Sequence, residues 1–260
     1  MREFEIVKID VSAQTASKVK DYVAEEKPLH LFLNKAYYAT ILCSPSNLKE
    51  LTVGHLLSEG ILKSFYEIAE VKMKNEACYV KIKSHVDLEK RLKLSKHFSR
   101  IITSACGSPY AYPFSGKIPK INSNLKVKAE TILNGVKNLN FIAETFRKTG
   151  GVHAAAIYKD NGELIAFAED VGRHNAVDKA IGIAALNKTD FSLCFLALSG
   201  RLTGDMVLKA GRAGLPIVAS LAAALDSGIA IAKDVGLTLI GFVRGKRMNI
   251  YTCPERILLN

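Results

Sequence analysis

The sequence predicts an α/β protein in which helices sandwich a mixed β-sheet, preceded by a smaller subdomain of mixed β and α structure. In residues 126–260, helical and strand-like segments follow one another in the order α-β-β-α-β-α-β-α-β. Residues 1–120 consist mainly of short strand-like segments. Residues 103–116 contain two prolines, two glycines and three serines, so we expect a loop there. We therefore expect two domains, 1–120 and 121–260.

In the smaller subdomain, several short stretches alternate apolar and polar residues, which is typical of strands with one exposed face. Asn34-Lys35 is a turn between two of these stretches, which form a hairpin. A helix begins after Pro45-Ser46 and ends at Gly60. A second hairpin and a short basic helix follow it. The strands are expected at residues 4–11, 29–33, 37–43, 68–73 and 78–82.

The larger domain begins with a helix over residues 126–148 and a hairpin with the turn Lys159-Asp-Asn-Gly. Helices and strands then alternate, which predicts that the inner strands of the sheet are mostly parallel. The later helices are expected at residues 175–186, 203–211 and 222–233, and the later strands at 191–198, 216–219 and 237–242.

The composition is that of an ordinary globular protein with an excess of positive charge. The 260 residues include 36 basic and 25 acidic side chains, a formal net charge of +11. The sequence has neither a signal-peptide pattern nor an apolar run of about 18 residues, which predicts a cytoplasmic protein that does not span a membrane. Five scattered cysteines indicate free thiols rather than a disulfide framework.

Residues 72–100 carry nine lysines and arginines against three acids. Along residues 78–83 the lysines alternate with apolar residues, as in a strand with one wet face. A solvated edge that resists aggregation is the interpretation we favour. A docking surface for an anionic partner is the alternative.

Two strand-to-helix turns carry an arginine. Ligands of α/β sheets bind where strands end and helices begin, because helix N-termini offer free N–H groups and positive charge. Glu169-Asp-Val-Gly-Arg-His-Asn contains Arg173, and Ser199-Gly-Arg contains a glycine that permits close approach of the backbone. These turns predict a phosphate-bearing ligand, with simple helix capping as the alternative. The candidate residues are Arg173, Ser199, Gly200 and Arg201.

The segment that follows the last core strand combines an aromatic residue with three cations around a glycine. Arg244, Lys246 and Arg247 are suited to clamping phosphates, and Phe242 to packing beside a base. A solvated turn is an equally good interpretation of this pattern.

Of the five cysteines, Cys106 has the surroundings of a reactive thiol. It lies in a polar loop beside Gly107 with basic residues nearby in the sequence, which favours the nucleophilic thiolate. A carrier thiol is therefore one interpretation and an inert side chain the other. We expect the remaining four to be unreactive: Cys43, Cys78, Cys194 and Cys253.

The order of elements is similar to that of the cytidine deaminase fold, but the zinc site of those enzymes is missing. Val152-His-Ala-Ala has Ala155 in place of the required acid, and no P-C-x-x-C is present. We therefore expect no metal site at His153 and His174.

Several motifs occur together in an order that identifies a family. They are Thr149-Gly-Gly-Val-His-Ala-Ala, Glu169-Asp-Val-Gly-Arg-His-Asn-Ala-Val-Asp-Lys, Ser199-Gly-Arg, Ala213-Gly-Leu-Pro-Ile-Val-Ala-Ser and Gly236-Leu-Thr-Leu-Ile-Gly-Phe-Val-Arg. From about residue 25 to the end, the chain resembles the formate dehydrogenase accessory sulfurtransferase family (FdhD). That resemblance implies a cytidine-deaminase-like three-layer α/β core and a homodimer.

The resemblance also implies a function. Members take sulfur from a cysteine desulfurase as a persulfide and pass it to the molybdenum (or tungsten) of a bis(molybdopterin guanine dinucleotide) cofactor for the formate dehydrogenase catalytic subunit. The persulfide position corresponds to Cys106, and Pro109 replaces the family's second cysteine. GDP is the implied surrogate ligand. The implied cofactor-binding segment is Phe242, Val243, Arg244, Gly245, Lys246 and Arg247.

Two other functions were weighed against sulfur transfer. A cofactor-binding chaperone without sulfur chemistry is the main alternative, because the second cysteine is missing. A nucleic-acid binder is disfavoured, because the basic stretch 72–100 has only Tyr79 and Phe98 as interleaved aromatic residues.

Overall fold

The computed structural model describes residues 1–95, 101–102 and 120–259 of the chain. Cys106 and Pro109 therefore lie outside the described residues. Within the described ranges, no helix is both long and apolar enough to cross a membrane.

The C-terminal half of the chain is built on a mixed sheet. Its strands are β9 (His153–Lys159), β10 (Leu164–Asp170), β11 (Cys194–Leu198), β12 (Ile217–Ser220), β13 (Thr238–Arg244) and β14 (Arg247–Ile250). Their order in the sheet is β10-β9-β11-β12-β13-β14. β9 is antiparallel to both of its neighbours, whereas β11, β12 and β13 run parallel to one another. The prediction of parallel inner strands is confirmed for these three, each of which a helix connects to the next.

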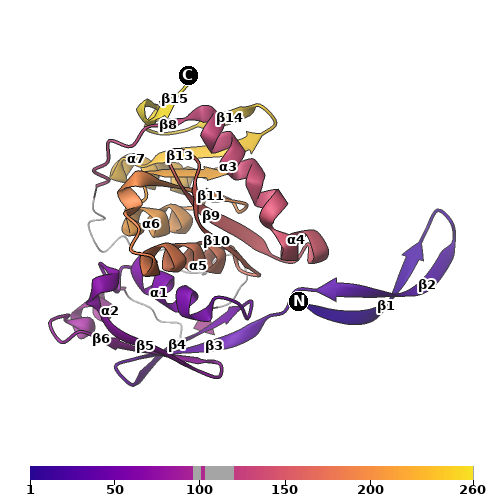
Figure 1. Cartoon of the computed structure of the whole chain (residues 1–260), viewed down its shortest axis with the longest axis horizontal. Coiled ribbons are helices and arrows are strands. Elements are labelled where there is room, and N and C mark those ends of the chain that lie inside the picture. Colours follow the sequence, from indigo (N-terminus) through magenta and orange to yellow (C-terminus); the bar gives the residue numbers. More distant parts are fainter. Residues whose placement is uncertain (96–100, 103–119, 260) are drawn as a thin grey trace.

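Helices cover both faces of this sheet (Figure 1). They are α5 (Arg173–Leu186), α6 (Gly204–Ala213) and α7 (Asp226–Val235) on one face and α3 (Ala129–Ile142) on the other. Successive strand residues point to opposite faces, so Leu196 packs with the first group and its neighbour Phe195 packs with α3. The predicted α/β sandwich with a mixed sheet is confirmed.

The single helix predicted over residues 126–148 is wrong, because the structure has two helices there. α3 ends and α4 (Glu144–Thr149) begins at Ala143, whose ψ of 80° is not helical. The carboxylate of Glu169 accepts hydrogen bonds from the backbone N–H groups of Thr145 and Phe146, at 3.0 and 2.8 Å. It thereby caps the second helix from across the fold.

The smaller subdomain contributes a second mixed sheet in the order β5-β6-β3-β4-β7. Both predicted hairpins are confirmed, as is the helix α1 (Leu48–Ser58). The strands are β3 (Lys27–Leu33), β4 (Ala36–Cys43), β5 (Ile68–Lys74), β6 (Ala77–Ile82) and β7 (Ile101–Ile102), and the short basic helix is α2 (Leu88–Ser95).

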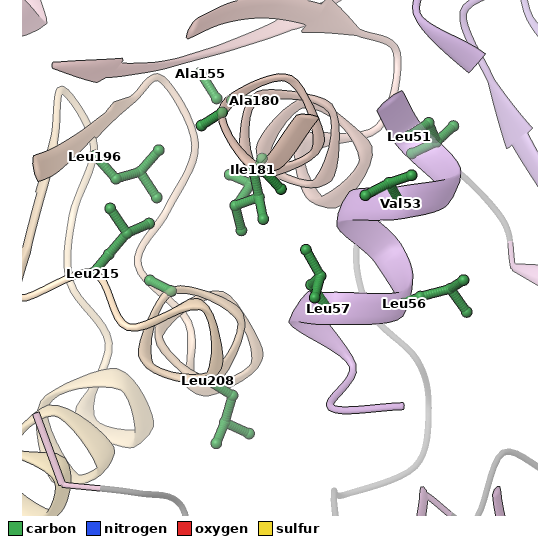
Figure 2. Packing of buried hydrophobic residues seen from close by; sticks show 14 of the residues in the cluster. Leu51, Val53, Leu56, Leu57, Ala155, Ala180, Ile181, Leu196, Leu208 and Leu215 are labelled. Carbon is green, nitrogen blue, oxygen red and sulfur yellow. The ribbon is translucent and has the colours of Figure 1, made fainter. Parts of the chain in front are cut away.

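α1 lies between this sheet and α5, and one continuous hydrophobic cluster runs from the smaller sheet through both helices to the larger sheet. Figure 2 shows the part of this cluster that lies between α1, α5, α6 and the larger sheet. The two helices cross at a pair of glycines. A Cβ on Gly54 would lie 1.7 Å from the backbone oxygen of Asp178, and a Cβ on Gly182 would lie 1.8 Å from that of Glu50. The close crossing thus depends on a glycine in each helix, and it joins the two parts of the chain in one core.

The N-terminal hairpin of β1 (Arg2–Asp10) and β2 (Thr15–Val23) projects away from the body (Figure 1). A strand was predicted over residues 4–11, but its partner was not. Near the base of the hairpin, the ammonium of Lys148 on α4 lies 5.8 Å from the ring centroid of Tyr22. The remaining elements are short: β8 (Val127–Lys128), β15 (Ile257–Leu258), and the 3-10 turns η1 (Phe65–Glu67), η2 (Phe191–Leu193) and η3 (Pro254–Arg256).

Candidate functional site

The candidate binding residues gather along one edge of the larger sheet, where β11, β12 and β13 end and β9 begins. The Ser199 hydroxyl accepts a hydrogen bond from the Ala154 N–H at 3.0 Å. One strand further along, the Ser220 hydroxyl donates to the Gly200 carbonyl at 2.6 Å. The Phe242 backbone N–H in turn donates to the carbonyl of Ala222, just after β12. Adjacent strand ends therefore place these turns side by side.

The segment from Phe242 to Arg247 forms the outer end of this edge. Phe242 has a φ of +51° at an irregularity in the pairing of β13 with β14, and its ring is exposed. The Arg244 Nε donates to the carbonyl of Leu221 at 2.9 Å, and its guanidinium lies 5.5 Å from the Phe242 ring centroid. An aromatic face and a guanidinium are thus held together at the surface.

The other members of this segment divide between core and solvent. The Val243 side chain is buried in the cluster beneath α3. Gly245 has a φ of +59° in the tight turn between the two strands, a conformation that favours glycine. Lys246 and Arg247 are exposed, and neither forms an ion pair with another described residue.

Arg173, the first residue of α5, is a buried cation without a hydrogen-bond partner at two of its nitrogens. Its exposure is only 5%, and Nε and Nη1 have no acceptor among the described residues. The aliphatic part of its side chain packs on Gly200, where a Cβ would lie 3.2 Å from the arginine Cβ. Arg201 is exposed at the same turn. Buried polar groups are normally paired, so these two nitrogens of Arg173 are an exception to that rule.

A cavity of about 400 Å³, lined in part by Ser199 and Leu221 but not by Arg173 or Arg201, lies between this end of the sheet and the α3–α4 region. Its volume is within the range of small-molecule sites. One wall is formed by the residues before and at the start of β9, and further wall residues follow β10, β11 and β12. The lining residues that matter here are Gly150, Gly151, His153, Val171, Ser199 and Leu221.

His153 lies half-buried in the wall of this cavity, 3.4 Å from the Ser199 hydroxyl through Nδ1. Burial and the positive charges of Arg173, His174 and Arg201 lower its pKa, and Asp170 only partly opposes them. The imidazole is therefore uncharged at neutral pH. The sequence suggested this residue only as a metal ligand and gave no sign of its half-buried place near Arg173 and Arg201. Among the described residues, no group of three or more potential ligands could hold a metal ion.

The Glu169–Lys179 motif makes buried polar contacts with the segment after β4, which belongs to the smaller subdomain. The buried Asp170 carboxylate is 2.7 Å from the Lys179 ammonium, and it accepts hydrogen bonds from the N–H of Ser44 and from the Asn175 amide. The Lys179 ammonium also donates to the Ser44 carbonyl at 3.0 Å. From the sequence, this motif was interpreted as a ligand-binding turn or a simple helix cap, whereas its acids and Lys179 have a structural role.

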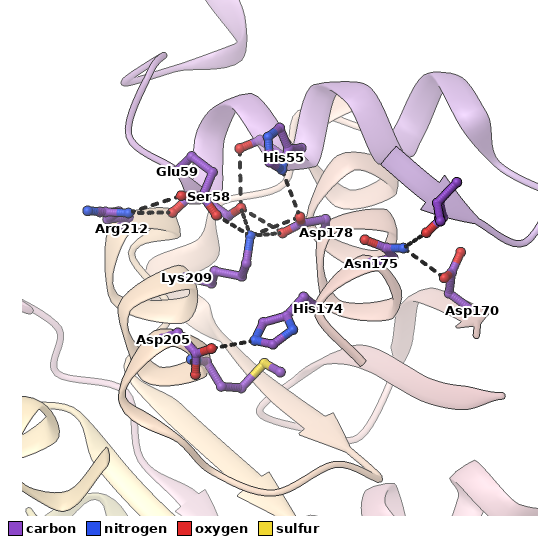
Figure 3. A network of polar contacts seen from close by, with 12 residues as sticks. His55, Ser58, Glu59, Asp170, His174, Asn175, Asp178, Asp205, Lys209 and Arg212 are labelled. Atoms are coloured by element: carbon purple, nitrogen blue, oxygen red, sulfur yellow. Dashed lines mark hydrogen bonds and ion pairs between the residues drawn. The ribbon is translucent and has the colours of Figure 1, made fainter. Parts of the chain in front are cut away.

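A second buried network lies between α1, α5 and α6 (Figure 3). The Lys209 ammonium is 2.9 Å from the Asp178 carboxylate and 2.6 Å from that of Glu59. The Ser58 hydroxyl also donates to Asp178, at 2.6 Å. Nearby, His174 Nε2 is 2.7 Å from an Asp205 oxygen, and this contact lowers the Asp205 pKa despite burial. The sequence held no local signal for these long-range contacts.

Three of the cysteines described in the structure are buried, and burial makes it unfavourable for them to ionise to thiolates. Cys43, Cys78 and Cys194 are buried. Burial raises the pKa of Cys43 to about 12 and that of Cys194 to about 11. Burial also raises the pKa of Cys78. Cys253 is partly exposed.

Comparison with known proteins shows what this fold and its motifs belong to. The family model described as the FdhD/NarQ family matches residues 24–258. The chain is 37% identical over 259 residues to the "Sulfur carrier protein FdhD" of Sulfolobus acidocaldarius, covering 99% of this chain and 98% of that one. It is 35% identical to the protein of the same name from Bacillus subtilis over 246 residues, covering 93% and 92% of the two chains.

A solved structure agrees with these sequence relatives. The crystal structure of a proposed formate dehydrogenase accessory protein from Desulfotalea psychrophila superposes with a TM-score of 0.79 at 28% identity, covering 99% of both chains. The resemblance inferred from the motifs is thereby confirmed, and the chain belongs to the FdhD/NarQ family.

Proposed function

We propose that this protein is a sulfurtransferase that carries sulfur as a persulfide on Cys106. It accepts the sulfur from a cysteine desulfurase and delivers it to the molybdenum (or tungsten) of a bis(molybdopterin guanine dinucleotide) cofactor required by formate dehydrogenase. The names of its relatives support the sulfur-carrying part of this proposal. The observation that supports cofactor binding is the group of arginines at one edge of the larger sheet, where β10, β11 and β13 end. Of these, the buried Arg173 lacks an acceptor among the described residues.

The proposed cofactor site extends along that edge from Arg173 and Ser199 to the exposed turn of β13 and β14. A guanine dinucleotide has a planar base and a diphosphate, which match the Phe242 ring and the cations beside it. Arg244 is already oriented by its bond to the Leu221 carbonyl, so part of the entropic cost of ordering a long side chain is met before binding. GDP is the simplest ligand with the same base and diphosphate.

The covalent step on this chain is a thiol exchange. The Cys106 thiolate attacks the outer sulfur of the desulfurase persulfide, a bond forms between these two sulfurs, and the desulfurase cysteine leaves as a thiolate. The exchange requires no external oxidant or reductant. The cytoplasm, where thiols stay reduced, is the compartment that fits such a carrier. We also propose that the protein acts as a homodimer, without nucleic acid or a membrane as partner.

The test is intact mass spectrometry after incubation with a cysteine desulfurase and cysteine. One added sulfur increases the mass by about 32 Da, and the increase should be removable by a thiol reductant. Cys106→Ala should abolish the adduct, whereas the matched control Cys253→Ala should retain it. An adduct that persists in Cys106→Ala would show that another residue accepts the sulfur.

A non-catalytic cofactor chaperone is the second candidate, because Pro109 occupies the position of the family's second cysteine. The two functions separate in a formate dehydrogenase maturation assay. A chaperone tolerates Cys106→Ala but fails with Arg244→Ala or Arg247→Ala. A sulfurtransferase fails with all three substitutions.

A further inference from the structure

The outer face of the smaller sheet is not covered by any helix or strand of the described residues. One face of this sheet packs on α1, and the other points away from the rest of the molecule (Figure 1). Along β3, Leu29, Leu31 and Leu33 are buried in the core. Successive strand residues point to opposite faces, so His30 and Phe32 between them belong to the outer face.

Three aromatic rings form a row across this outer face. In the strand register, Phe32 lies opposite Tyr79 of β6 on one side and opposite Tyr37 of β4 on the other. Its ring stacks on that of Tyr79 with centroids 4.7 Å apart, and it meets the Tyr37 ring edge-on at 5.7 Å. The Tyr37 hydroxyl is 2.8 Å from that of Thr40, which is also 2.8 Å from Nδ1 of His30. Tyr79 and Tyr37 are about two-fifths exposed, so ordered rings face solvent.

Lysines border this aromatic row on the β5 and β6 strands. Lys72 and Lys74 of β5 and Lys81 of β6 are exposed on the outer face. Glu70 shares that face and lies 2.7 Å from Lys72, whereas Lys74 and Lys81 form no ion pair with another described residue. Lysines on the edge strand β5 protect the edge from pairing, but β6 is an inner strand. Uncompensated positive charge beside exposed rings favours an acidic partner.

A cavity of about 460 Å³ lies at the other end of the row, between the β3–β4 hairpin and α2. Tyr37 belongs to its wall, so the cavity continues directly from the aromatic row. Its other apolar wall residues are Leu33, Val86, Leu88 and Leu92. A pocket beside a rigid aromatic ring is the usual place for an apolar anchor of a protein interface.

The distribution of charge favours a protein partner over a single-stranded nucleic acid. A nucleic acid requires cations along its whole path, because every nucleotide carries a phosphate. Here the lysines lie on β5 and β6, whereas Asp87 and Glu89 line the cavity at the other end of the row. A protein can place acidic side chains over the lysines and an apolar side chain in the cavity.

The position of this sheet in the chain indicates which protein partner it serves. β7 lies beside β4 in the same sheet and ends at Ile102, four residues before Cys106 in the sequence. Thiol exchange requires direct contact between the two sulfurs, so the sulfur donor must bind on a surface near the accepting cysteine. The proposed cofactor edge belongs to the other sheet, beyond α1 and α5, and a donor on the outer face leaves it open.

We propose that the outer face of the smaller sheet is the docking surface for the sulfur donor, a protein with an acidic contact region. Tyr79, Phe32 and Tyr37 are the central anchors, and Lys74 and Lys81 face acidic side chains of the donor. The docking surface rests on the proposed function, because the donor is the cysteine desulfurase of that function. The lysines speed association, and the rings slow dissociation.

The experiment measures binding of the full-length protein to a cysteine desulfurase by biolayer interferometry at about 150 mM salt. We expect Tyr79→Thr to weaken binding about tenfold through faster dissociation, and Lys81→Glu to slow association about tenfold. Both side chains are exposed, and circular dichroism checks that each variant stays folded. The matched controls Phe141→Ala and Lys137→Glu change exposed side chains on α3, beyond the larger sheet, and should bind like the wild type.

Sulfur loading of Cys106 provides a second measurement and tests the proposed function separately. Tyr79→Thr should raise the desulfurase concentration for half-maximal loading about tenfold and leave the maximal rate unchanged. Glutathione persulfide needs no docking surface: the thiolate attacks its outer sulfur and glutathione leaves as a thiolate. It should load the wild type and Tyr79→Thr equally. A wild type that gains sulfur from neither source loses the sulfurtransferase role, whereas the binding measurements still decide the docking surface.

The proposal is overturned if Tyr79→Thr and Lys81→Glu bind the desulfurase as tightly as the wild type. It is also overturned if light scattering shows that Tyr79→Thr converts a dimer into a monomer, because the outer face then joins two copies of the chain. A single-stranded oligonucleotide that binds the wild type at the same salt concentration, but not Tyr79→Thr, would likewise overturn it in favour of a nucleic-acid partner.

Discussion

Because α1 and α5 cross so closely, adding one methyl group at Gly182 should strongly destabilise the protein. A Cβ on Gly182 would lie 1.8 Å from the Glu50 carbonyl oxygen, about 1.6 Å short of ordinary contact at 3.4 Å. The three nearest atoms all belong to the backbone of Glu50 inside α1, so no side-chain rotation relieves the clash. The helices must separate, which opens the hydrophobic cluster that joins the two parts of the chain.

We expect Gly182→Ala to lower the free energy of unfolding by about 3 kcal/mol or more, at the upper end of overpacking effects. For a chain of this length the thermal midpoint should fall by roughly 6–12 °C. The intrinsic helix preference of alanine acts in the opposite direction by about 1 kcal/mol, so a net loss is diagnostic.

Circular dichroism during thermal and urea unfolding measures this effect. The matched control is Gly135→Ala in the middle of α3, where the added Cβ meets the Phe195 ring at 3.0 Å rather than backbone. A ring can shift by a few tenths of an ångström, so the control should lose much less stability. Equal stability of Gly182→Ala and the wild type would refute the geometry of the crossing.

Three further predictions concern the buried charges and thiols. Lys209→Met leaves Asp178 buried without its ammonium and should cost about 3–5 kcal/mol in urea unfolding, so a loss below about 1 kcal/mol would contradict the network. Because folding lowers the Asp205 pKa, its carboxylate stabilises the fold at pH values above the unfolded pKa of about 3.8, and this stability is lost as the pH falls below that value. Asp205→Asn should therefore be less stable than the wild type at pH 6. Its free energy of unfolding should also fall less steeply than that of the wild type as the pH is lowered. Alkylation of the native protein at pH 7.5, measured by peptide mass spectrometry, should spare the buried Cys43, Cys78 and Cys194. Rapid labelling of any of these three would contradict their burial.

Sequence signals were sufficient where the determinant was local. The hairpin of β3 and β4 was predicted from Asn34-Lys35, and both residues have the positive φ values, 47° and 74°, that a tight hairpin turn requires. The alternation of helices and strands likewise predicted the parallel order of β11, β12 and β13.

The errors arose where a distant residue decides the local structure. No proline or glycine marks the break at Ala143, because Glu169 creates it by capping α4. The helix predicted from residue 222 begins at Asp226, since the preceding residues instead pair with Leu202 through two backbone hydrogen bonds of 2.9 and 3.0 Å.

Only the part of the candidate site that follows from the order of the strands was predictable from the sequence. Topology places the turns after parallel strands on one edge, so Ser199, Gly200 and Phe242 could be grouped from the sequence alone. The burial of Arg173 and the lowered pKa of His153 depend on side chains from three separate elements. No spacing rule in a single sequence reports such an arrangement.

Transfer of labelled sulfur would show whether Cys106 passes its persulfide sulfur to the cofactor. The protein is loaded with radioactive sulfur by a cysteine desulfurase, freed of the donor, and mixed with the bis(molybdopterin guanine dinucleotide) cofactor. We expect label to leave wild-type Cys106 for the cofactor, and Arg244→Gln to load normally but retain its label. Label that stays on the wild-type chain in the presence of bound cofactor, or that loads and transfers equally well in Cys106→Ala, would contradict it.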